Sequence, residues 1–187
     1  MHESDETIYY RFLREGENDD MRELMRRHRE SLTLFLYGIV HDMEDAEELM
    51  LDAFVAAGMG QSIFYGKSSF KTWLFAIGRN QALKHLQKKG RRAVPSEAVT
   101  SEVASEDSPE KELLRQERDR TLYLTMEKLN PDYRQILHLI YFEDMSPEEA
   151  GRVMKKNRKQ IYNLIQRSRE ALRQKLIEEG MEQYLDR

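Results

Sequence analysis

The sequence predicts an all-α protein made of two small helical domains joined by a flexible acidic linker. Apolar residues recur at helical spacing along most of the chain. Strong helix formers are common, while the 187 residues include only 9 Gly and 4 Pro. Neither a period-two strand pattern nor an Asn-Gly hairpin turn occurs. The helical pattern lapses after residue 92 and resumes near residue 110, which separates a first domain (1–92) from a second (110–187).

The first domain is expected to contain amphipathic helices over residues 21–40, 46–57 and 70–86. In each of them apolar residues follow the i, i+3, i+4, i+7 spacing that places them on one side of a helix. The intervening segment GMGQSIFYGKSS has the composition of a surface loop. Its consecutive apolar residues, 63–65, either pack back onto the helices or bind a partner, and both alternatives stay open.

Residues 93–109 form the expected linker, because they are rich in Ser and Glu and carry no apolar stripe. A helix is expected to follow Pro109. Asn130 and the proline after it then match the N-cap and first-turn residues of the next helix.

Two further helix starts are marked by capping boxes. In the first, Ser146 is the N-cap, Pro147 follows it and Glu149 stands three residues on, which opens a short helix that ends near Met154. In the second, Asn157 and the glutamine three residues later open the last helix. A short helix, a tight turn and a long helix give the length pattern of a helix-turn-helix, although helical hairpins with other roles look similar.

Charge favours DNA as the ligand of this motif. The chain carries a formal net charge of -4, yet residues 152–175 hold nine Lys or Arg and one acid. A solvated charged face is the alternative interpretation of any single charge block. On a helical wheel, Ile161, Ile165 and Leu172 fall on one side of the last helix.

The other side and the flanks of its first half carry side chains that can bind bases or phosphates: Arg158, Lys159, Tyr162, Asn163, Gln166 and Arg167. Arg and Lys can donate to guanine, and Asn and Gln can pair with adenine in the major groove. A helix-turn-helix inserts this half of its second helix into that groove. The sequence therefore predicts DNA binding by the last helix.

Several other classes of protein are not indicated. The five histidines share no metal-ligand spacing, and neither a Gly-rich phosphate loop nor a cysteine occurs. We expect no catalytic residue, no metal and no cofactor. The N-terminus lacks a signal-peptide pattern, and no apolar run reaches the roughly 18 residues of a membrane span. We therefore expect a cytoplasmic protein without membrane insertion.

Three segments resemble the extracytoplasmic-function sigma factors, the small promoter-recognition subunits of bacterial RNA polymerase. They are DMEDAEELMLDAFVAA, FKTWLFAIGRNQALKHLQKKGRR and EKLNPDYRQILHLIYFEDMSPEEAGRVMKKNRKQIYNLIQRSREAL. Together they cover nearly the whole chain apart from the linker and the two ends. The resemblance implies a factor that binds core polymerase and directs promoter recognition and transcription initiation by sequence-specific DNA binding. It also implies that the first domain is sigma region 2 and the second sigma region 4.

The resemblance further implies roles for particular residues. The acidic helix would dock on a coiled coil of the largest polymerase subunit through Asp45, Glu48, Leu49 and Asp52. Contacts to the promoter −10 element would come from Phe64, Tyr65, Arg79, Asn80, Lys84 and Lys88, the first two lying in the loop that captures a flipped base. The helix-turn-helix would read the −35 element. An anti-sigma factor is implied as an inhibitory partner, and Trp73 is expected to pack in the core.

The sequence departs from the family pattern in the turn, and two rival functions remain. Lys155 and Lys156 stand where the family usually has Gly and an aliphatic residue, and Gly151 stands where Ala is usual, which puts the −35 preference and the tightness of the turn in doubt. A polymerase-independent regulator would bind a duplex operator tightly by itself. An adaptor whose basic helix meets an acidic protein would bind DNA weakly and without sequence preference.

Overall fold

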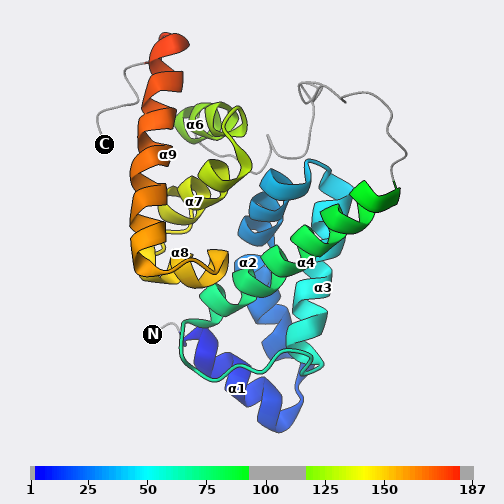
Figure 1. The fold of residues 1–187 in the computed structure, drawn as a ribbon. Helices are drawn as coiled ribbons and strands as arrows, with labels where there is room; N and C mark the ends of the chain where they lie inside the picture. The colour runs from blue at the N-terminus through cyan, green and yellow to red at the C-terminus, as the bar shows by residue number, and fades with distance from the viewer. Residues whose placement is uncertain (1–2, 93–116, 182–187) are drawn as a thin grey trace.

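The computed structural model describes residues 3–92 and 117–181, and the secondary structure of these ranges is entirely helical (Figure 1). The first part comprises four helices, α1 (Asp5–Glu15), α2 (Asn18–Val40), α3 (Met43–Gly58) and α4 (Phe70–Arg92). The second comprises α6 (Glu117–Glu127), α7 (Pro131–Tyr141), α8 (Pro147–Met154) and α9 (Arg158–Glu178). The all-α prediction is confirmed. The expected linker over residues 93–109 and the helix start after Pro109 lie outside the described ranges.

Helix α1 was not predicted from the sequence, although its caps are readable there. The Ser4 hydroxyl accepts a hydrogen bond from the Thr7 backbone N–H at 3.2 Å, and Gly16 ends the helix with φ 71°. Tyr9 is buried, and its hydroxyl donates to the carbonyl of Ala57 at 3.0 Å. This hydrogen bond ties α1 to the end of α3.

Helix α2 lies at the centre of the molecule. It packs against α1, α3 and α4 and also against α7 of the second part. Every residue from Leu32 to Val40 is buried, so this half of α2 is covered all round rather than on one face. The two parts of the chain therefore meet on α2 and α4.

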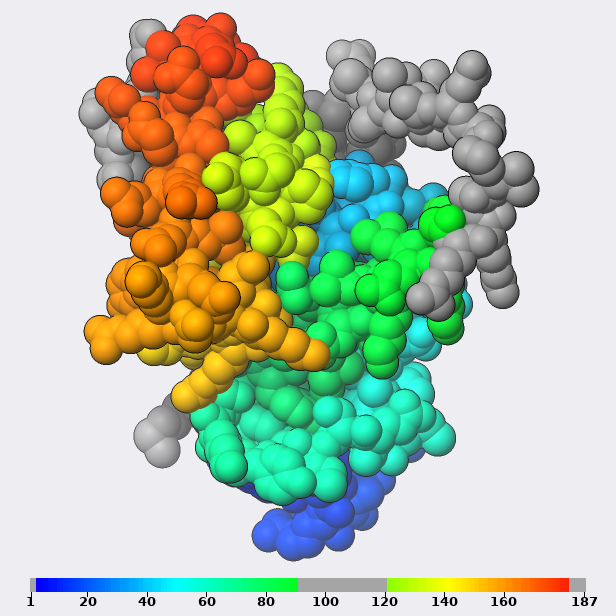
Figure 2. Space-filling model, in the orientation of Figure 1, coloured from blue at the N-terminus to red at the C-terminus, as the bar shows by residue number. Residues whose placement is uncertain are grey.

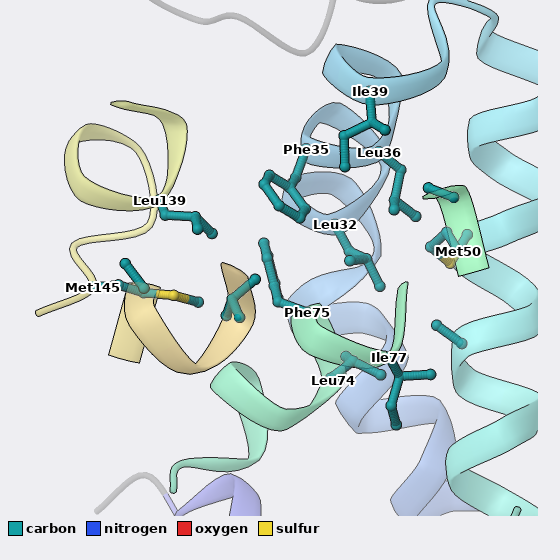
Figure 3. Close-up of a cluster of buried hydrophobic side chains, with 14 of the residues drawn as sticks. Leu32, Phe35, Leu36, Ile39, Met50, Leu74, Phe75, Ile77, Leu139 and Met145 are labelled. Carbon is teal, nitrogen blue, oxygen red and sulfur yellow. The ribbon is translucent and has the colours of Figure 1, made fainter. Parts of the chain in front are cut away.

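The two domains share a continuous apolar core, which the sequence did not predict. Phe75 of α4 is fully buried and lies 5.3 Å, between ring centroids, from Phe35 of α2. Leu139 of α7 and Met145, just before α8, point toward these two rings (Figure 3). Burial of such side chains contributes about 1.5–3 kcal/mol each, so the second domain is held against the first by apolar contact.

The helix-turn-helix begins and ends where the sequence predicts. Asn130, Ser146 and Asn157 cap α7, α8 and α9, and both capping boxes are formed. Lys155 takes the left-handed conformation, with φ 53°, at the position where the sequence resemblance leads us to expect Gly. The Lys156 N–H then donates to the carbonyl of Gly151 at 2.9 Å. The departures from the family pattern thus leave a tight turn.

Candidate nucleic-acid interface

The first half of α9 presents its polar side chains to solvent. All six residues predicted to contact DNA there are exposed: Arg158, Lys159, Tyr162, Asn163, Gln166 and Arg167. The opposite side of the helix is buried and includes Ile161, Ile165 and Leu172, as the helical wheel predicted. Figure 2 shows α9 along an outer edge of the molecule.

Contacts within the motif orient part of this surface. The Tyr162 hydroxyl donates to Glu148 Oε1 of α8 at 3.3 Å. The Arg158 guanidinium stands 5.7 Å from the centroid of the Tyr162 ring, within the range of a cation–π contact. Lys159, Asn163 and Gln166 make no such contact within the described residues, so their amide and ammonium groups are free to meet base edges or phosphates.

The side chains expected at the −10 element divide between two environments on α4. Lys84 and Lys88 are exposed, and Asn80 is half-buried. Arg79, by contrast, is only 7% exposed, and its Nε donates to Gln135 Oε1 of α7 at 2.7 Å. Burial lowers the pKa of Arg79, with an opposing attraction from Asp132. In this arrangement Arg79 meets the second domain and is covered from solvent.

In the loop before α4, one aromatic residue is buried and the next one is exposed. Phe64 is 8% exposed, and its ring centroid lies 5.1 Å from Trp73 and 5.7 Å from Tyr9. Tyr65 is 71% exposed, with the Lys67 ammonium 5.9 Å from its ring centroid. Packing is therefore the correct alternative for Phe64, which is closed to a flipped base here, whereas Tyr65 remains accessible. The expectation that Trp73 packs in the core is confirmed.

The acidic helix α3 carries its predicted polymerase contacts on more than one face. Glu48 and Asp52 are exposed. Asp45 is half-buried and pairs with His85 and Lys89 of α4, each at 3.0 Å. Burial works to raise the pKa of Asp45, but Lys89 and His85 outweigh it and hold that pKa below its usual value.

Leu49 is buried at 5% exposure, so it supports the core and is inaccessible to a partner. Sequence reasoning missed the apolar residues that do face solvent on α3. Leu51 and Val55 are 48% and 49% exposed, and they share a helix face with Glu48 and Asp52. Leu51 lies three residues after Glu48 and Val55 three residues after Asp52, a spacing that could have identified them. This acidic and apolar strip is called the α3 face below and consists of Glu48, Leu51, Asp52 and Val55.

The described residues do not offer a metal site or a membrane span. Within residues 3–92 and 117–181, acidic and histidine side chains nowhere gather in a group of three that could hold a metal ion. Over the same ranges, each helix is too short or too polar to cross a bilayer.

Two family models match the chain, and together they span both parts of the structure. Sigma-70 region 2 matches residues 24–92, and Sigma-70, region 4 matches residues 119–172. The second match contains all of α8, the turn after it, and α9 up to Leu172.

Individual relatives agree with these matches. The chain is 32% identical over 180 residues to the RNA polymerase sigma-H factor of Pseudomonas aeruginosa, covering 91% of this chain and 92% of that one. It is 29% identical over 141 residues to the ECF RNA polymerase sigma-E factor of Escherichia coli K12, covering 71% and 74%.

Solved structures with a similar fold come from complexes. The sigma factor RpoE, in complex with the anti-sigma factor NepR from Bartonella quintana, has a TM-score of 0.63 at 25% identity, covering 84% of this chain and 96% of that one. CnrH, in complex with the cytosolic domain of CnrY, has a TM-score of 0.64 at 22% identity, covering 91% of this chain and 95% of that one. At this identity the similarity is one of fold alone.

Proposed function

This chain belongs to the sigma-70 family as an extracytoplasmic-function RNA polymerase sigma factor, and from that premise we propose which surface meets each partner. As a family member it serves promoter recognition in transcription initiation and is not an enzyme. We assign residues 1–92 to region 2 and residues 110–187 to region 4. Since its partners, polymerase and promoter DNA, reside in the bacterial cytoplasm, we infer that it acts there.

Region 4 reads the −35 element through α9. The observation that carries this proposal is the exposed polar surface of the first half of α9, where Lys159, Asn163 and Gln166 stand clear of other described side chains. Arg158, Tyr162 and Arg167 flank these residues and suit phosphate contacts. Since bidentate base contacts discriminate by about 1–3 kcal/mol, a few such side chains are enough to select a sequence.

The test is a selection of preferred upstream sequences with polymerase present. Lys159→Ala and Gln166→Ala should each relax the preference at one or two base pairs by about 1–3 kcal/mol. Arg173→Ala is the matched control, since Arg173 is an exposed cation on the second half of the same helix. Unchanged preferences with uniformly weaker binding would demote Lys159 and Gln166 to phosphate contacts.

Region 2 binds the −10 element through the loop before α4 and the outer side of α4. Tyr65 is the accessible ring on which an unpaired base can stack, which is worth about 1–3 kcal/mol. Phe64 supports that loop from below by packing on Trp73. Asn80, Lys84 and Lys88 then continue along α4 as DNA contacts.

Core polymerase docks on the α3 face. An acidic strip with apolar residues between its carboxylates suits a helical partner that offers basic and apolar side chains, such as the coiled coil of the largest subunit. Asp45 acts indirectly, by fixing α3 to α4 through His85 and Lys89. Glu48→Lys should weaken association with core polymerase, whereas Glu30→Lys, an exposed charge reversal on α2, should not. Equal association of the two variants would place the docking surface elsewhere.

An anti-sigma factor is the third partner that we propose. One solved structure with a similar fold is the sigma factor RpoE in complex with the anti-sigma factor NepR, which supports the proposal.

A further inference from the structure

Helix α1 holds both ends of the loop before α4, although the region 2 family match begins only at residue 24. At the start of α4, Glu6 Oε1 accepts a hydrogen bond from the Phe70 backbone N–H at 2.8 Å. At the end of α3, the Tyr9 hydroxyl donates to the Ala57 carbonyl at 3.0 Å. The loop that carries Tyr65 is therefore fixed to α1 both where it leaves α3 and where it enters α4.

Tyr10 of α1 lies against the middle of this loop. Its ring centroid is 5.7 Å from that of the buried Phe64, and the two ring planes are inclined by 40°. A Cβ built on Gly66 would lie 3.0 Å from the Tyr10 hydroxyl oxygen, so this close approach suits glycine, whose φ here is 67°. Figure 1 shows the loop passing beside α1. Tyr10 thus contacts the loop next to Tyr65, whose ring is accessible.

Two exposed aromatic rings belong to this one site. Within the described part of the chain, the exposed aromatic side chains are Tyr10, Tyr65 and Tyr162. Tyr162 stands on the α9 surface, whereas the other two meet at the loop before α4. Tyr10 stays 46% exposed although Phe64 packs behind it. A ring that is held from behind and open in front is a ready stacking surface, since every nucleobase has an aromatic face.

The charges around these two rings are compatible with a DNA strand. Asp5, on the same helix, is paired with Arg27 at 2.8 Å, so its charge is neutralised within the protein. Arg14 pairs with the neighbouring Glu15 at the surface, where such pairs contribute little and a phosphate can replace the carboxylate. Lys67, on the loop itself, is exposed. Two cations are thus available for phosphate groups beside the rings.

We propose that Tyr10 is a second base-stacking residue of the −10 site, and that it receives the unpaired base next to the one that Tyr65 receives. The ligand is the single promoter strand that is exposed when the duplex opens. Stacking tolerates any base, so Tyr10 adds affinity for the open strand rather than a base preference. Helix α1 thereby becomes part of the DNA-binding surface of region 2. This inference rests on the proposed function, because it adds a subsite to the same −10 site.

The test is a cycle of protein and DNA changes, measured with holoenzyme assembled from core polymerase and the full chain. The probe is a labelled single-stranded oligonucleotide with the non-template strand of a promoter whose start site the wild-type chain directs. In a series of such oligonucleotides, one base at a time is removed to leave an abasic site, and affinity is read from fluorescence anisotropy. Such a cycle isolates the contact between one side chain and one base.

The protein variants separate the ring of Tyr10 from its other properties. Tyr10→Ala removes the ring, and Tyr10→Leu removes it while keeping an apolar contact with Phe64. Tyr10→Phe keeps the ring and removes the hydroxyl. Tyr65→Ala locates the base that the neighbouring ring receives. The matched control is Leu13→Ala, which shortens another exposed apolar side chain of α1.

Tyr10→Ala and Tyr10→Leu should each weaken binding of the intact strand by about fivefold or more, the least that stacking on one aromatic ring contributes. An abasic site at one position should weaken wild-type binding by a similar factor and leave these two variants unaffected. The corresponding position for Tyr65→Ala should be the adjacent nucleotide. Tyr10→Phe and Leu13→Ala should match the wild type throughout, and every variant should bind core polymerase equally.

Four results would overturn the proposal. Wild-type affinity in Tyr10→Ala and Tyr10→Leu would mean that no base stacks on Tyr10. Weaker binding that stays sensitive to an abasic site at every position would mean that Tyr10 only supports the loop. A loss in Tyr10→Phe as large as in Tyr10→Ala would assign the effect to the hydroxyl beside Gly66. Weaker association of Tyr10→Ala with core polymerase would place Tyr10 on that interface instead.

These results are distinguishable from a failure of the proposed function. Each of the four is obtained with a wild-type chain that directs core polymerase to start sites, so the proposed function stands in all of them. A wild-type chain that directs no start sites would refute the proposed function, and this inference with it.

Discussion

Replacing Lys155 with glycine should stabilise the protein, because the backbone of residue 155 takes the left-handed conformation in the turn between α8 and α9. Its φ is 53° and its ψ is 43°, a region that costs an L-residue roughly 1–2 kcal/mol. Glycine avoids that cost but has more freedom to lose on folding, which offsets about 0.4–1 kcal/mol. The exposed Lys155 side chain makes no hydrogen bond within the described residues. Lys155→Gly should therefore raise the free energy of unfolding by about 0.5–1 kcal/mol.

The measurement is urea unfolding followed by circular dichroism, compared at equal m-value, with a thermal scan beside it. The thermal midpoint should rise by about 1–3 °C in a chain of this size. The companion variant Gly151→Ala should do the opposite. A Cβ there would lie 3.0 Å from the backbone oxygen of Lys156, whose own N–H is held by the Gly151 carbonyl at 2.9 Å.

In the Gly151→Ala variant, overpacking should cost about 1–3 kcal/mol of stability. This cost should exceed the roughly 1 kcal/mol that alanine gains over glycine in a helix. A Lys155→Gly chain that unfolds at lower urea concentration, with unchanged m-value, would mean that the left-handed conformation of Lys155 does not cost stability.

Three further predictions concern the core, the loop and the docking face. Burial acts to raise the pKa of Glu143, but its partners, Lys71 among them, outweigh burial and hold that pKa at about 2 instead of 4.5. The Glu143 carboxylate therefore stabilises the fold fully above pH 4.5 and loses that contribution as pH falls toward 2. Glu143→Gln should therefore reduce, by roughly 3 kcal/mol, the loss of unfolding free energy that occurs as pH falls. A loss of the same size in the variant and the wild type would contradict the charged pair of Glu143 and Lys71. Phe64→Ala should destabilise the chain by about 3–5 kcal/mol in urea unfolding, whereas Tyr65→Ala should change stability by under about 0.5 kcal/mol yet impair promoter opening in a permanganate footprint. Strong destabilisation by Tyr65→Ala, with impaired promoter opening in a stable Phe64→Ala chain, would exchange the roles of the two residues. Val55→Asp should weaken core polymerase binding by about 1 kcal/mol or more in a titration, with normal stability, and full affinity would remove Val55 from the docking face.

Local signals in the sequence predicted local structure well. The caps at Asn130, Ser146 and Asn157 depend on hydrogen bonds within three residues, so their pattern is complete in the sequence. The exposed side of α9 followed from helical periodicity alone. Leu49 was expected to contact polymerase, but its helical spacing falls in the apolar stripe of α3, where it is buried at 5% exposure.

What the sequence could not reveal depends on long-range contacts. The closure of region 4 on α4 joins Lys71 to Glu143, 72 residues apart, and Arg79 to Gln135. No periodicity encodes such pairs. In the loop before α4, Phe64 and Tyr65 are adjacent aromatic residues, and the aromatic cluster formed with α1 is a long-range contact that buries Phe64. Helix α1 is an exception, because its caps at Ser4 and Gly16 are local signals and yet it was not predicted.

The most direct test is transcription by purified core polymerase on a library of promoter sequences, with and without this chain. We expect start sites that appear only with the chain and that share two upstream elements, of which Lys159→Ala alters the −35 element alone. Absence of chain-dependent start sites, together with tight binding of the chain alone to a duplex operator, would contradict this expectation and favour the polymerase-independent regulator.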